Sequence, residues 1–158
     1  MNGEIIPAAA EIDAFQVATR DLVGVAVRSL DLLEGQVSLP QFRLLVVLEE
    51  LGTSPSSRVA RALGLGASSV TRLGDRLEAS GHIVRGPDPH SRSVVTLELT
   101  PAGRELVAQV MQWRRAELSR ILSRLPAGAR AELAAGLRRF HDAVGREYAG
   151  DLHGPVPL

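Results

Sequence analysis

The chain has 158 residues, a length that suits one compact domain or one protomer of a small oligomer. Its 18 basic residues, all arginine, balance 18 acidic residues, and it has no cysteine, which excludes disulfides, thiolate metal sites and cysteine-based redox sensing. No apolar run approaches the roughly 20 residues of a membrane span, and the first residues lack the pattern of a secretion signal. We therefore expect a cytoplasmic protein without a membrane partner.

The N-terminal part is predicted as a tail over residues 1–10 and a dimerisation helix over 11–35. Apolar residues recur at helical spacing from Ile12 to Leu33, and Gly35 is placed to end the helix. Residues 1–53 carry eight acidic residues against three arginines. A surface with this charge is poorly suited to DNA and better suited to another protein.

Residues 36–100 are predicted to form one winged helix-turn-helix module. A helix over 40–51 is apolar on nearly every side, which indicates burial. Two short helices over 56–63 and 67–80 follow, separated by Gly64-Leu65-Gly66, and this arrangement is typical of a helix-turn-helix. A β-hairpin comes next, with strands over 83–85 and 94–99 and a loop over 86–93. A hairpin directly after a helix-turn-helix forms a wing.

The helix predicted over 67–80 has an apolar face and a polar face. Val70, Leu73 and Leu77 point inward. Glycine destabilises the interior of a helix by about 1 kcal/mol relative to alanine, so we expect Gly74, which lies beside these residues, to be there because it permits close packing. The opposite face carries hydroxyl and guanidinium groups, which can read base edges. Residues 54–93 hold six arginines and three acids, a net charge of +3. The candidate DNA-contacting residues of the module are Ser68, Ser69, Thr71, Arg72, Arg76, Arg92 and Arg58.

The arginines of this surface have different expected roles. Arg72 is the main candidate for a base contact, with a phosphate contact or an ion pair to Asp75 or Glu78 as alternatives. Arg76 favours a phosphate contact and could instead form an intrahelical pair. Arg58, on the first helix of the motif, is either a phosphate contact or a solvated charge.

The C-terminal part is predicted as two dimerisation helices over 101–148 and a tail over 149–158. Thr100 suits the N-cap and Pro101 the first position of a helix that runs to about residue 125. A second helix over 129–148 carries apolar residues in near-heptad spacing. These helices and the N-terminal helix have more apolar surface than the small module can cover, which favours packing against a second copy. A three-helix cap on a monomer is the alternative.

Three stretches resemble the MarR family of bacterial transcription regulators, namely residues 65–81, 85–92 and 97–106. The sequence Leu-x-Leu-Thr-Pro-Ala-Gly that begins at Leu97 is the most specific part, and the resemblance extends over about residues 11–147. It implies a mainly α fold with a small β-hairpin wing, a recognition helix that enters the major groove, and terminal helices that interlock two protomers.

The wing departs from the family's pattern. By the resemblance, Arg92 reaches the minor groove from the wing tip, a contact that a narrow groove favours. The usual second acid and one of two usual arginines are here Ser91 and Ser93. We therefore expect a wing with less charge than is typical of the family.

The residues and the resemblance together predict a sequence-specific transcription regulator, with repression as its expected output. It would bind a palindromic operator in double-stranded DNA as a homodimer and be released by a small-molecule effector. Phe42 and Trp113 are weak candidates for an effector pocket, and a core position is the more ordinary role of both. The alternative function is a winged-helix protein-interaction module that does not bind DNA. No nucleophile–base pair, phosphate loop or metal-ligand spacing is visible, so no enzyme activity, cofactor or metal is expected.

Overall fold

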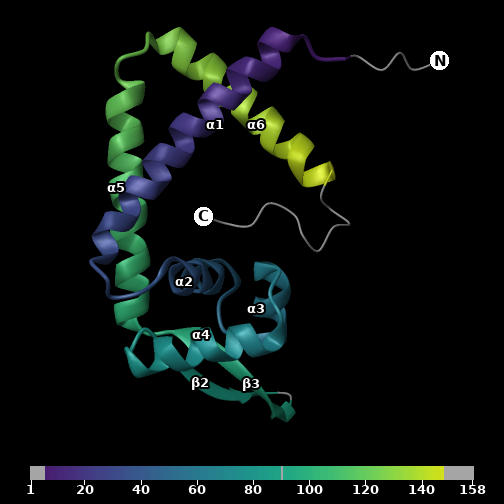
Figure 1. The fold of residues 1–158 in the computed structure, drawn as a ribbon, viewed down its shortest axis with the longest axis vertical. Helices are drawn as coiled ribbons and strands as arrows, with labels where there is room; N and C mark the ends of the chain where they lie inside the picture. The colour runs from purple at the N-terminus through teal and green to yellow at the C-terminus, as the bar shows by residue number, and fades with distance from the viewer. Residues whose placement is uncertain (1–5, 90, 148–158) are drawn as a thin grey trace, which may run out of the picture.

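The computed structural model describes residues 6–89 and 91–147, so His90, the first half of the predicted N-terminal tail and the whole predicted C-terminal tail lie outside it. One long helix joins a compact module at one end to a pair of crossing helices at the other (Figure 1). The predicted class, mainly α with a small β wing, is confirmed. The elements in chain order are α1 (Ala9–Ser29), the 3-10 helix η1 (Leu30–Leu33), α2 (Leu39–Leu51), β1 (Ser54–Pro55), α3 (Ser56–Leu63), α4 (Ala67–Ala79), β2 (Ile83–Asp88), β3 (Ser91–Leu99), α5 (Pro101–Leu122) and α6 (Ala127–Glu147).

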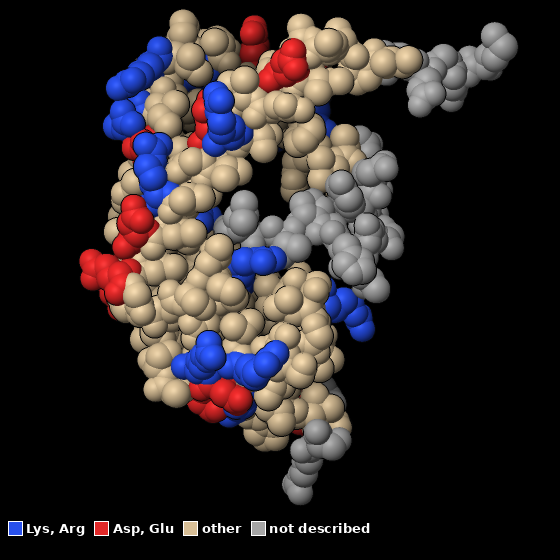
Figure 2. Space-filling model, viewed as in Figure 1, with Lys and Arg blue, Asp and Glu red and all other residues tan. Residues whose placement is uncertain are grey.

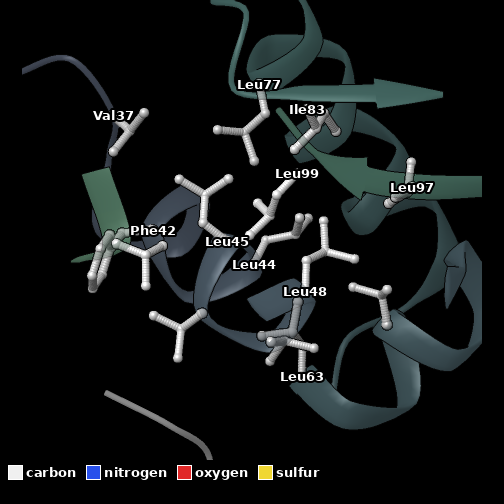
Figure 3. Close-up of a cluster of buried hydrophobic side chains, with 14 of the residues drawn as sticks. Val37, Phe42, Leu44, Leu45, Leu48, Leu63, Leu77, Ile83, Leu97 and Leu99 are labelled. Carbon is white, nitrogen blue, oxygen red and sulfur yellow. The ribbon is translucent and has the colours of Figure 1, made fainter. Parts of the chain in front are cut away.

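Helix α2 forms the centre of the module. Its residues 44–48 are all buried, which confirms the prediction from its apolar composition. The leucines of α2 lie against side chains from α3, α4 and both long strands, as Figure 3 shows for Leu63, Leu77, Ile83 and Leu97. Burying a leucine of this kind stabilises a fold by about 1.5–3 kcal/mol. Helices α3 and α4 therefore stand on a single packed core.

The wing is longer than the sequence indicated. Strands β2 and β3 extend through most of the residues predicted as a loop over 86–93, and that prediction was wrong. Gly86 pairs with Thr96 and Pro87 with Val95 in an antiparallel ladder. Because the strand order is β1-β3-β2, β2 is an edge strand, where proline is tolerated. The two-residue strand β1, which pairs with β3, was not predicted.

The start of α5 is fastened to the end of the helix-turn-helix. Thr100 caps the helix by accepting a hydrogen bond from the Gly103 N–H at 3.1 Å, and Pro101 occupies the first position, as predicted. The Thr100 hydroxyl donates to the Gly81 carbonyl at 2.7 Å, and its N–H donates to the His82 carbonyl at 3.0 Å. These bonds set the direction in which α5 leaves the module.

The long helices begin and end near the predicted positions. Helix α1 starts at Ala9 and gives way after Ser29 to the 3-10 turn, which ends where Glu34 adopts a left-handed φ of 45°. Helix α5 ends at Leu122, about three residues earlier than predicted, and α6 starts at Ala127, two residues earlier. Helix α1 packs along α5, whereas α6 folds back and crosses α1 (Figure 1).

Polar side chains join α1 to α5. The buried Ser29 accepts a hydrogen bond from Arg114 Nε at 2.6 Å. Glu117 receives two hydrogen bonds from Arg120, at 2.7 and 2.9 Å, and lies 3.8 Å from a guanidinium nitrogen of Arg28. The hydrogen bond from Arg120 and the nearby positive charges lower the pKa of Glu117 below its ordinary value of 4.5.

We expect this lowered pKa to make stability depend on pH in the acid range. A carboxylate with a depressed folded-state pKa stabilises the fold above its unfolded pKa, and this contribution is lost as the pH falls through the folded pKa. Glu117→Gln should therefore flatten the decline in melting temperature below about pH 4.5. Thermal unfolding from pH 3 to 7, with Glu132→Gln on α6 as the control, measures the difference. An identical decline in both variants would contradict the expectation.

Candidate nucleic-acid interface

The turn between α3 and α4 orients the second helix. Gly64 ends α3 with a left-handed φ of 63°, and the Leu65 N–H donates to the Ala60 carbonyl at 2.9 Å. Val70 and Leu77 of α4 are fully buried. One face of α4 is thereby fixed to the core, and the opposite face is turned to solvent.

The exposed face of α4 carries the side chains that the sequence singled out. Ser68, Thr71, Arg72 and Arg76 are exposed, and Ser69 is half-buried. The Thr71 hydroxyl donates to the Ala67 carbonyl of its own helix at 3.0 Å. The structure therefore places most of the predicted α4 residues on one accessible surface.

Ion pairs do not tie the arginines of this surface to other parts of the described chain. Within the described residues, Arg72 and Arg76 form no salt bridge, and neither do Arg58 and Arg61 of α3, which are also exposed. The alternatives of an Arg72 pair with Asp75 or Glu78 and of an intrahelical pair for Arg76 are therefore not realised. Four guanidinium groups remain available to phosphates or base edges.

The acidic residues of α4 form ion pairs instead with an arginine that was not among the predicted site residues. Arg85 of β2 donates from Nη1 to Asp75 at 2.7 Å and to Glu78 at 2.9 Å, and from Nη2 to the Thr71 carbonyl at 3.2 Å. The alternation of side chains along a strand could have identified Arg85, because it puts this residue on the same inward face as Ile83, two residues earlier. Acidic and basic side chains adjoin on the lower part of the molecule (Figure 2).

Gly74 is the position over which Arg85 lies. A Cβ atom there would stand 2.7 Å from Arg85 Nη2 and 3.8 Å from Ile83 Cδ1. The expectation of close packing is confirmed, but the partner is a side chain of the wing.

The remaining predicted residues belong to other elements of the fold. Arg92 belongs to β3, and its side chain is outside the described part of the structure. Phe42 is fully buried in the core, and Trp113 is half-buried on α5. Among the described residues, no group of three or more metal-ligating side chains comes together. None of the described helices has the length and apolar character needed to cross a membrane.

Comparisons with known proteins give the surface its context. The model of the MarR family matches residues 36–92. The HTH-type transcriptional regulator YfiV of Bacillus subtilis is 30% identical over 101 residues, which are 64% of this chain and 63% of YfiV. Across three such curated relatives, the chain covers from 46% to 63% of the relative's own length.

Solved structures extend the likeness beyond the matched segment. The crystal structure of RV1404 from Mycobacterium tuberculosis has a TM-score of 0.81 and 33% identity, over 90% of this chain and 99% of that one. Streptococcus pneumoniae FabT, solved in complex with DNA, has a TM-score of 0.71 over 88% of this chain and 99% of its own, and at 20% identity it is similar in fold alone. Because the family model spans the helix-turn-helix and the curated relatives that match are transcriptional regulators, this chain belongs to the MarR family of transcription regulators.

Proposed function

We propose that the protein is a sequence-specific DNA-binding regulator that reads base edges with α4. The observation that supports this most directly is the exposed face of α4. There, hydroxyls and two arginines that form no ion pair with another described residue stand on a helix fixed by the core. Arginine in the major groove pairs with guanine through two hydrogen bonds. That FabT, which shares the fold, was solved in complex with DNA is consistent with the proposal.

We propose that two copies act together. Helices α1 and α6 expose large apolar side chains, including Phe15 at 51% and Phe140 at 48%, whose rings lie 5.1 Å apart. Apolar grooves of about 790 and 320 Å³ border this ring pair, and an exposed apolar patch rimmed by polar residues is typical of an interaction surface. A second copy on this face would cover the grooves and present two α4 helices.

A two-fold dimer has a defined footprint on DNA. Two recognition helices in successive major grooves require half-sites about 10 bp apart, which gives an imperfect palindrome of about 16–20 bp with its flanks. Such a complex blocks a promoter that it overlaps, so repression is the proposed output. The proposed location of the protein is the cytoplasm, where this DNA lies. A small-molecule effector would favour a dimer whose α4 spacing does not fit the operator. It would do so by binding that dimer more tightly than it binds a dimer whose spacing fits.

The proposal predicts different effects for two arginines of one helix. Arg72→Ala should cost about 1–3 kcal/mol on the preferred duplex and relax discrimination at particular base pairs. Arg76→Ala should weaken all duplexes alike and reduce the salt slope by about 1. Fluorescence anisotropy on a duplex selected from a randomised pool, and on its point-substituted series, measures both. Uniform loss for both variants would remove Arg72 from the base-reading role.

The wild-type chain provides the test of DNA binding itself. Affinity for a nonspecific duplex should fall steeply and linearly on a log–log plot against salt, because phosphate contacts release counterions. Absence of binding at low salt would contradict the proposal and favour a winged helix that binds proteins only.

A further inference from the structure

The contact between Arg85 and α4 joins the two parts of the proposed DNA-reading surface. The guanidinium of Arg85 comes from the wing strand β2, and its partners Thr71, Asp75 and Glu78 all belong to α4. The Arg85 side chain is 26% exposed, whereas the Asp75 and Glu78 side chains are 57% and 42% exposed. One partly buried arginine therefore holds two carboxylates that solvent, or a bound phosphate, can still approach.

The charge of α4 depends on this contact. Within Ala67–Ala79, two arginines are offset by two acids, Asp75 and Glu78, so the helix by itself has no net charge. Adding Arg85 makes the cluster +1 and directs the two carboxylates toward the wing. A negative charge beside the DNA phosphates opposes association, and neutralising it favours association with every sequence.

Stability alone does not account for the arrangement. Ion pairs whose carboxylates are largely exposed, as those of Asp75 and Glu78 are, contribute little to the free energy of folding, because solvent screens them. The Arg85 guanidinium nevertheless lies over Gly74, the one glycine within α4, where an added Cβ would lie 2.7 Å from Nη2. Helix α4 thus contains a residue unfavourable to helices at the point where the guanidinium crosses it.

We propose that Arg85 is a positioning residue of the DNA-binding surface. It neutralises Asp75 and Glu78 and ties β2 to the Thr71 carbonyl, so that α4 and the wing approach DNA as one unit with a net positive charge. Gly74 provides the space for this contact. The inference rests on the proposed function, since it concerns the same surface.

The test removes the Arg85 charge and then neutralises the two carboxylates that it pairs with. Arg85→Ala should lower the affinity for specific and nonspecific duplexes alike, by on the order of tenfold at low salt. Asp75→Asn with Glu78→Gln on the Arg85→Ala background should restore most of that loss, because no carboxylate is then left unneutralised. Anisotropy titrations with both duplexes at several salt concentrations give the readout, and thermal unfolding verifies that each variant folds.

A methyl group at Gly74 tests the same contact without changing any charge. Gly74→Ala should leave the melting temperature equal to or above that of wild type, since the atom it meets is the end of a flexible side chain. Its DNA affinity should fall several-fold. Gly145→Ala, at an open position of α6, is the matched control and should bind DNA as wild type does.

The outcomes separate this inference from the proposed function. If the wild-type chain binds no duplex, the proposed function fails. If wild type binds but Arg85→Ala and Gly74→Ala bind equally well, the positioning role is overturned. The electrostatic role is also overturned if the triple variant stays as weak as Arg85→Ala, because the lost affinity then does not come from the two carboxylates.

Discussion

Phe140→Glu is expected to convert the proposed dimer to monomers and to lower operator affinity by about a hundredfold or more, because the second half-site is then no longer bound by a linked copy. Phe140 is 48% exposed, and its ring lies 5.1 Å from that of Phe15 on α1. It lines the grooves on both sides of that contact. A carboxylate buried there without a partner would strongly disfavour association.

A control for this substitution lies two residues earlier on the same helix. Successive residues of an α-helix are about 100° apart, so Arg138 projects from the side roughly opposite Phe140. Arg138→Glu introduces the same side chain and should leave the protein dimeric. Light scattering after gel filtration gives the mass, and anisotropy with the selected duplex gives the affinity. A dimeric Phe140→Glu variant with unchanged affinity would show that this face is not the dimer contact.

Gly103→Ala is expected to destabilise the protein by about 3 kcal/mol, at the upper end of the cost of overpacking. A Cβ at this position would overlap the His82 carbonyl oxygen and crowd Leu99 Cδ2 at 3.2 Å. The His82 carbonyl already accepts the Thr100 N–H, and backbone atoms cannot rotate away as the end of a side chain can. The helix α5 would have to shift relative to the module.

The first turn of α6 supplies the matched control for Gly103. Gly128 has nothing within 4 Å of an added Cβ, so Gly128→Ala should be neutral or stabilising. We expect the melting temperature of Gly103→Ala to fall by about 10 °C relative to wild type, given about 2–4 °C per kcal/mol for a chain of this size. Equal melting temperatures for the two alanine variants would contradict the overlap.

Local sequence patterns determined much of the module. The apolar spacing of α4, the glycine turn before it and the Thr100–Pro101 helix start all appear in the structure as predicted. Each depends on backbone preferences or on side chains within a few residues of one another. The exposed position of Arg72 followed from the same periodicity.

Contacts between residues distant in sequence were decided by the tertiary structure alone. The pairing of Arg85 with Asp75 and Glu78 depends on how the wing folds against α4, and the length of the wing depends on the partner strand that β3 offers. The closeness of Gly103 to the His82 carbonyl depends on the angle at which α5 leaves the module. A single sequence records which groups can interact, whereas packing of the common core sets which of them come within reach.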